Sequence, residues 1–294
     1  MIKELSILIP VLDEKESISS LVDEIKSEFS NSEVNYEIVI VDDFSEEPVD
    51  TYLSGKNLKI IRNPHSKGQS HSILVGVSEA SYDFLAIMDG DGQNPPKEIL
   101  KLLNLFNENF NNCDVVSGIR KVRKDNLLRT LYSKIANLII RFLTKSKCKD
   151  LGCALKIFKK EMISELNYNG DIHRILVPLF EYRGYKLIQT EVEHRHREFG
   201  KTKYGFSRLT AVIIDSILLY LTKGFTTTAR YALGKLSIFF GLISGFLFIL
   251  SLYQKQMNDV FIHRNPIFLI GITTFFICLQ LLVTSFISFF IENK

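Results

Sequence analysis

The chain has 294 residues and a formal net charge of +3, which is enough for one large domain with further segments. Its four cysteines have neither the spacing of a metal site nor that of a secreted disulfide framework, so we expect reduced thiols in the cytosol. Residues 1–119 carry 9 basic and 21 acidic side chains, whereas residues 120–294 carry 27 and 12. Because the basic half also holds the most apolar segments, an anionic membrane surface is favoured over nucleic acid as its partner.

Short apolar runs alternate with helical patterns along the first 120 residues. Strands are expected at 5–12, 36–43, 58–63, 82–90 and 113–120, and helices at 13–29, 67–80 and 95–110. This alternation predicts an α/β fold with a doubly wound, mostly parallel sheet. Ligands of such sheets bind beyond the carboxyl ends of the strands.

The pattern changes after residue 120. A basic amphipathic helix is expected at about 126–147, and a strand followed by a basic, glycine-bearing loop is expected within 184–206. A second amphipathic stretch at 207–225 is expected to lie on a membrane surface. These segments would bring cations to the place where the chain meets lipid.

Two runs without charged residues lie near the end of the sequence, at 236–254 and 266–291. Each is long enough to cross a hydrocarbon core of ~30 Å as a helix, and the short loop between them predicts a transmembrane hairpin. We therefore predict three parts: a catalytic domain at 1–205, an interfacial amphipathic helix at 206–230 and the hairpin at 231–294.

Two pairs of acidic residues follow predicted strands: Asp42 with Asp43, and Asp89 with Asp91. Two carboxylates one residue apart can hold Mg²⁺ or Mn²⁺ when the phosphates of a substrate supply further oxygens, and Gln93 adds an amide oxygen at the same turn. The alternative is an ordinary solvated turn, in which Asp and Gly are common. The position after a buried strand, together with the second acid pair, favours the metal.

Four stretches of the first hundred residues carry a family resemblance: LSILIPVLDEKESI, YEIVIVDDFS, KGQSHSILVGV and MDGDGQNPP. In order, they resemble family 2 glycosyltransferases with the GT-A fold, and among these the polyprenyl-phosphate glycosyltransferases related to dolichol-phosphate mannose synthase. Three later stretches look most like the undecaprenyl-phosphate 4-deoxy-4-formamido-L-arabinose transferases: KDLGCALKIFKK, HREFGKTKYGFSRL and LTKGFTTTARYALG.

The resemblance implies a role for each residue that matches a motif of the family. The residues expected to bind the nucleotide-sugar donor are Pro10, Leu12, Glu14, Asp42, Asp43, Lys67, Gln69, Asp89 and Gly90. The metal, Mg²⁺ or Mn²⁺, is expected on Asp89, Asp91 and Gln93. The residues expected to bind the acceptor phosphate are Arg120, Arg129, Ser133, Arg197, Lys201 and Lys203. The expected catalytic residues are Asp150 and Asp91.

Some of these residues also have a plainer interpretation. Asp150 could be only a turn cap. His194 and His196 are interpreted as surface residues, because no third ligand lies near them in the sequence.

Three positions depart from the pattern that the sequence resembles. The family usually has Asn where this chain has Asp13, Gly where it has Phe44, and Leu or a similar residue where it has Gly92. The last two fall in the expected base pocket and metal turn.

The resemblance implies an enzyme that moves a sugar, with inversion, from a nucleotide-diphosphate sugar to a polyprenyl phosphate in the lipid bilayer. It would be a multi-pass protein of the plasma (inner) membrane with its catalytic domain on the cytoplasmic face, and a homo-oligomer is left open. A processive polysaccharide synthase is disfavoured, because the chain has no Trp and hence no Q-x-x-R-W motif. A nicotinamide-binding domain is disfavoured by the absence of G-x-G-x-x-G after the first strand. A non-enzymatic partner of a glycan assembly or flippase system remains the alternative.

Overall fold

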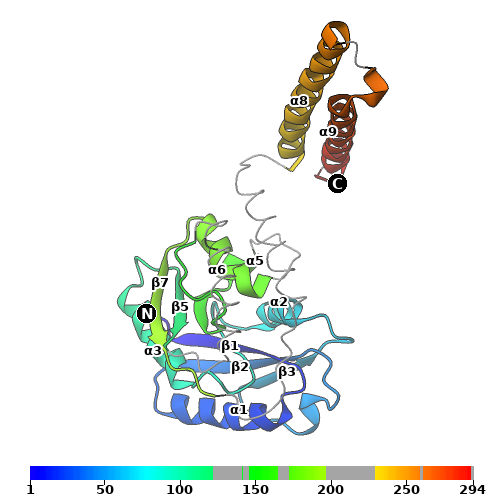
Figure 1. The fold of residues 1–294 in the computed structure, drawn as a ribbon. Helices are drawn as coiled ribbons and strands as arrows, with labels where there is room; N and C mark the ends of the chain where they lie inside the picture. Colours follow the sequence, from blue (N-terminus) through cyan, green and yellow to red (C-terminus); the bar gives the residue numbers. More distant parts are fainter. Residues whose placement is uncertain (122–140, 142–145, 165–171, 197–228, 259–260, 293–294) are drawn as a thin grey trace. The chain divides into compact units, whose positions relative to one another are not determined.

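The computed structural model describes residues 1–121, 141, 146–164, 172–196, 229–258 and 261–292. The chain forms two compact units, Met1–Ile217 and Leu218–Lys294, which are described separately here (Figure 1). The helix expected at about 126–147 and the interfacial segment expected at 206–230 lie outside the described residues, apart from residues 141, 146–147 and 229–230.

The first unit is built on a seven-stranded sheet. In chain order, its strands are β1 (Glu4–Val11), β2 (Asn35–Asp42), β3 (Leu58–Arg62), β4 (Phe84–Ile87), β5 (Val115–Arg120), β6 (Lys156–Lys159) and β7 (Leu187–Val192). Their order in the sheet is β3-β2-β1-β4-β6-β5-β7. All neighbouring pairs are parallel except those of β6, which runs antiparallel to both β4 and β5. The predicted mostly parallel α/β sheet is therefore confirmed.

Helices cover both faces of this sheet, as the apolar strands require (Figure 1). Alternate residues of β1 face opposite layers: Ile7 and Ile9 pack with α1 (Lys15–Ser30) and α3 (Lys97–Glu108). Leu8 packs instead in the opposite layer, with three further helices of the described residues. These are α2 (Gln69–Glu79), α5 (Glu161–Ser164) and α6 (Ile172–Tyr182). A short 3₁₀ turn, η1 (Val49–Thr51), follows β2.

The second unit is a helical hairpin of α8 (Ala229–Asn258) and α9 (Pro266–Glu292), joined through the 3₁₀ turn η2 (Ile262–Arg264). Small polar side chains bond the two helices: Ser237 Oγ donates to the Cys278 carbonyl at 2.9 Å, and Ser244 Oγ donates to the Gly271 carbonyl at 3.0 Å. Their outward surfaces expose large apolar side chains. By length and composition, segments Leu233–Met257 and Pro266–Ile287 could each cross a membrane.

Candidate active site

The site lies where the carboxyl ends of β1, β2 and β4 meet. β1 lies between β2 and β4, since the chain passes from it to β2 and β3 on one side and returns to β4 on the other. The register places Val11 beside Asp42, and β4 ends at Ile87, two residues before Asp89. Both acid pairs therefore come to one edge of the sheet at a topological switch point, where doubly wound folds bind ligands.

The turn after β4 holds its carboxylates by local contacts. Gln69 Nε2 donates to Asp89 Oδ1 at 2.8 Å, and the backbone N–H of Gln93 donates to Asp91 Oδ1 at 3.1 Å. A side chain at Gly90 would bring its Cβ to 3.1 Å from Val11 Cγ2, so glycine lets the turn pass close over β1. Gly92 has φ +71°, a conformation that glycine adopts without strain, so this departure from the family pattern suits the turn.

The electrostatics of the turn favour a cation. Burial and the neighbouring Asp91 charge raise the pKa of Asp89 to about 6, although Lys156, Arg120 and the hydrogen bond from Gln69 act in the opposite direction. Within the described residues, no group of three or more His, Cys, Asp or Glu side chains could hold a metal. Two carboxylates and the Gln93 amide oxygen are too few for a cage of protein ligands, but they fit Mg²⁺ or Mn²⁺ that arrives with a diphosphate.

The segment after β7 is joined to this turn. The Arg195 amide donates to the Gln93 carbonyl at 2.7 Å, and Gln93 Nε2 donates to the Arg195 carbonyl at 3.3 Å. Arg195 Nη1 also contacts both carboxylate oxygens of Glu24, at 2.9 and 3.0 Å. The start of the predicted basic loop is thus fixed beside the turn of Asp89 and Asp91. The remaining acceptor candidates lie outside the described residues: Arg129, Ser133, Arg197, Lys201 and Lys203.

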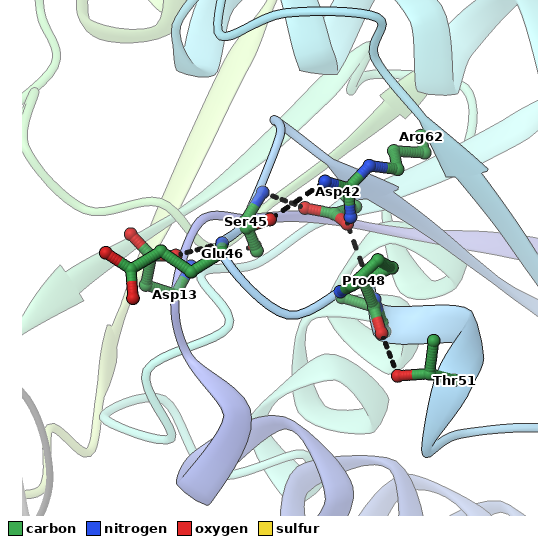
Figure 2. A network of polar contacts seen from close by, with 8 residues as sticks. Asp13, Asp42, Ser45, Glu46, Pro48, Thr51 and Arg62 are labelled. Carbon is green, nitrogen blue, oxygen red and sulfur yellow. Dashed lines mark hydrogen bonds and ion pairs between the residues drawn. The ribbon is translucent and has the colours of Figure 1, made fainter.

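Asp42 is completely buried and organises the loop that follows β2 (Figure 2). Its carboxylate accepts hydrogen bonds from the Ser45 amide at 2.8 Å and the Val49 amide at 3.4 Å, and from Arg62 Nη1 at 3.0 Å. The loop is also tied to Asp13, whose Oδ1 accepts from the Glu46 amide at 2.8 Å. The predicted contact of Asp42 with the base remains a prediction.

Asp43 clamps the loop that carries Lys67. Its carboxylate accepts from the amides of Lys67 and Gly68, at 2.9 and 2.8 Å, and from Asn63 Nδ2 and Ser66 Oγ, each at 2.8 Å. Burial alone would raise the pKa of Asp43, but these four hydrogen bonds outweigh it and lower the pKa. The carboxylate thereby sets the start of α2 and the position of Gln69.

Replacing Asp43 with asparagine is expected to lower the free energy of unfolding by about 2–4 kcal/mol. The side-chain NH₂ of asparagine would point at hydrogen-bond donors, and the negative charge that strengthens these hydrogen bonds would be lost. A carboxylate with a lowered pKa stabilises the fold above its unfolded pKa of about 3.9 and loses that contribution as the pH falls through the folded value. Chemical unfolding of Asp43→Asn and wild type at pH 7 and at about pH 3, below the unfolded pKa, measures this. The difference should shrink at the lower pH, and an equal difference at both would contradict the role of the charge.

Pro10, Leu12 and Glu14 lie along the end of β1 and the entry to α1. Pro10 pairs with Val41 of β2, and the Glu14 carbonyl accepts the amides of Ser17 and Ile18 in the first turn of the helix. The three residues line the same edge as the acid pairs. Their predicted contact with a nucleotide remains a prediction.

Asp150, predicted to be catalytic, and Arg120, predicted to bind the acceptor phosphate, bind each other. Arg120 Nε and Nη2 donate to the two carboxylate oxygens of Asp150, each at 2.8 Å, and Asp150 is only 4% exposed. Gly152 makes room for this pair, because a Cβ there would lie 2.7 Å from Arg120 Nη2. The pair stands beside β4, since the turn at 150–152 leads into antiparallel β6 at this edge.

Several supporting residues were not predicted. Lys156 is buried, and its Nζ donates to the Cys153 carbonyl, while Ser70 Oγ lies 2.9 Å from His173 Nδ1 beside Gln69. The contact of Ser70 with His173 joins segments that are far apart in the chain, so no local pattern marks it, and the burial of Lys156 is set by the folded core. His194 is half-buried and His196 is exposed, and the described residues gather no metal-binding group around either.

Comparison with known proteins gives consistent findings. The sequence model of glycosyl transferase family 2 matches residues 6–166. The chain is 27% identical to dodecaprenyl-phosphate galacturonate synthase of Rhizobium johnstonii (strain DSM 114642 / LMG 32736 / 3841), over 97% of this chain and 86% of that protein. It is 30% identical to undecaprenyl-phosphate 4-deoxy-4-formamido-L-arabinose transferase of Enterobacter sp. (strain 638), over 88% of this chain and 78% of that protein.

Among solved structures, the chain resembles glucosyl-3-phosphoglycerate synthase from Mycobacterium tuberculosis in complex with Mn²⁺, uridine diphosphate and glucosyl-3-phosphoglycerate. The TM-score is 0.58 with 16% sequence identity, and the match covers 75% of this chain and 80% of that one. At this identity the likeness concerns the fold alone.

Proposed function

Because this chain belongs to glycosyl transferase family 2, and is therefore an enzyme, we propose that it transfers a sugar from a nucleoside diphosphate sugar to a polyprenyl phosphate at a membrane surface. The observation that carries the proposal is the pair Asp89 and Asp91 at the switch point of the sheet. Their mutual repulsion, with the raised pKa of Asp89, favours a cation that accompanies a diphosphate.

The two named relatives agree on the class of acceptor and differ in the sugar that they transfer. Both named relatives act on polyprenyl phosphates, dodecaprenyl in one and undecaprenyl in the other, but their sugars are a galacturonate and a formamido-arabinose. The acceptor is therefore the feature that they share. Undecaprenyl phosphate is the first acceptor to test, and the sugar has to be identified by experiment.

Asp89, Asp91 and Gln93 would hold Mg²⁺ or Mn²⁺, which when bound would neutralise the leaving diphosphate. The acceptor phosphate needs no strong base, because its second pKa is about 6 and it is already largely anionic at neutral pH. Asp150, fixed by Arg120, would then orient the sugar rather than remove a proton. Attack on the face opposite the diphosphate would invert the configuration of the sugar carbon.

The hairpin of α8 and α9 would anchor this chemistry to the plasma (inner) membrane. Lys223, Arg230 and Lys235 lie before or at the N-terminal end of the first span, which favours a cytoplasmic catalytic domain. Lys255 in the last turn of α8 and Arg264 in η2 weaken the bias. A cysteine introduced at Asn258 should react with an impermeant reagent added from outside. Labelling near residue 60 instead would show the opposite orientation.

The function is tested with the full-length protein in detergent, Mn²⁺ or Mg²⁺, undecaprenyl phosphate and a panel of nucleotide sugars. Mass spectrometry should find one lipid product, heavier than undecaprenyl phosphate by a single sugar residue, and EDTA should abolish it. Polymeric products would indicate a processive synthase. Failure to consume any nucleotide sugar, in a protein that remains folded, would contradict the proposed donor class.

A further inference from the structure

Phe44 has a backbone conformation that is costly for its side chain. It follows Asp43 directly after β2 and has φ +72°, the left-handed region that bulky residues rarely adopt. Its neighbours impose this conformation, since the Ser45 amide donates to buried Asp42 and the Asp43 amide donates to the Val11 carbonyl, both at 2.8 Å. Strained residues held in this way gather at ligand clamps and active sites.

Phe44 is 50% exposed in spite of that cost. The Arg62 guanidinium lies over it, with 4.9 Å between the guanidinium carbon and the ring centroid. Arg62 is itself fixed, because it donates to the Asp42 carboxylate at 3.0 Å and to the Ser45 carbonyl at 2.9 Å (Figure 2). A ring that is backed by a fixed cation and half open to solvent has the properties of a stacking platform rather than of core packing.

Phe44 follows the end of β2, at the same end of the sheet as Asp89 and Asp91. Only β1 separates β2 from β4, so the ends of these strands are about 10 Å apart at the usual strand spacing. With the diphosphate beside Asp89 and Asp91, a nucleoside that extends across β1 brings its base to the end of β2. On the other side of β4, the edge is occupied by the closed pair of Arg120 and Asp150.

We propose that Phe44 binds the nucleobase of the donor by stacking on it. The proposal rests on the proposed function, because it adds a residue to the donor site. Stacking tolerates every base, since each has a π-face, so Phe44 contributes affinity while base selectivity has to come from other groups. If the ring served only to cover Arg62, its removal would lower stability and leave nucleotide binding unchanged.

The test compares Phe44→Gly with wild type by calorimetric titration of the full-length protein in detergent with Mn²⁺. Affinities for uridine and guanosine diphosphates should fall about 5- to 100-fold, the range expected for a lost base–aromatic stack. Affinity for inorganic pyrophosphate, which has no base, should stay the same. The melting temperature should be unchanged or higher, because glycine adopts this φ without strain. Phe44→Tyr keeps the ring and should keep the affinity.

Asn57→Gly is the matched control, because Asn57 also has a positive φ, of 60°. Asn57 precedes β3 and so lies at the amino ends of the parallel strands, away from the candidate site at their carboxyl ends. This substitution should leave nucleotide affinity unchanged. Nucleotide binding by Phe44→Gly within twofold of wild type would overturn the role of Phe44 and leave the proposed function standing. If wild type binds neither nucleotide, the proposed function fails and the inference fails with it.

Discussion

Replacing Asp89 with asparagine should remove nearly all turnover and at the same time make the metal-free protein more stable. The carboxylate is held near Asp91 and is poorly solvated, so its charge is costly until a cation binds. Asparagine keeps the oxygen that accepts from Gln69 but loses the charge. We expect turnover to fall by about 10²–10⁴-fold, the scale of several kcal/mol of lost charge stabilisation. Asp91→Asn should lose turnover to a similar extent.

The stability gain should depend on pH in a definite direction. The folded pKa of Asp89, about 6, is above the ordinary value of 3.8, so ionisation of Asp89 opposes folding and stability falls as the pH rises through this interval. In EDTA, Asp89→Asn should therefore exceed wild type by on the order of 1–3 kcal/mol at pH 7.5 and match it near pH 4. Thermal and urea unfolding at both pH values measure the difference.

Asp83→Asn is the matched control, because Asp83 is exposed just before the amino end of the same strand, β4. It should change neither turnover nor stability. An Asp89→Asn protein that keeps near-wild-type turnover, or is less stable than wild type in EDTA at pH 7.5, would contradict the assignment of this turn.

Replacing Arg120 with lysine should impair catalysis although the charge is kept. Lysine cannot make the two parallel hydrogen bonds that fix Asp150, so the carboxylate should lose its orientation. We expect kcat to fall about tenfold or more and the apparent KM for polyprenyl phosphate to rise. The activation free energy measured by kcat/KM should increase by roughly 1.5–3 kcal/mol. Steady-state kinetics with varied lipid acceptor separates the two constants.

Gly152→Ala tests the same pair without touching either partner. The new Cβ would lie 2.7 Å from Arg120 Nη2, so the guanidinium has to move away from Asp150. Its kinetic defect should resemble that of Arg120→Lys. Lys59→Ala, which breaks an exposed ion pair with Glu79, should have almost no effect. If Arg120→Lys and Gly152→Ala both keep wild-type kcat and KM, the pair has only a structural role.

The parallel core of the fold could be predicted because its signal is local. Residues 36–43 were expected to be a buried strand and β2 occupies Asn35–Asp42, since apolar side chains are needed on both faces of a covered sheet. β6 gave no such signal, because only Ile157 and Phe158 lie between Lys156 and Lys159. No helix was predicted at α6, where Pro178 lies inside the helix and is an unfavourable signal.

The position of the candidate site in the fold could be predicted from the sequence, but the contacts between its side chains could not. Strand ends brought Asp42, Asp43, Asp89 and Asp91 to one edge without any knowledge of tertiary contacts. The pairing of Arg120 with Asp150 depends on antiparallel β6, which was not predicted, so the sequence did not indicate that these two side chains bind each other. The positive φ of Phe44 is likewise set by contacts that only the folded loop contains.

The central claim is that Asp89 and Asp91 hold a divalent cation together with the donor diphosphate. Its most direct test is a crystal structure of the full-length protein with Mn²⁺ and uridine diphosphate, in which anomalous scattering locates the manganese. The account predicts one strong peak within coordination distance, about 2.0–2.3 Å, of carboxylate oxygens of this pair and of the diphosphate. A bound nucleotide with its manganese away from both carboxylates, or a diphosphate held there without manganese, would contradict it.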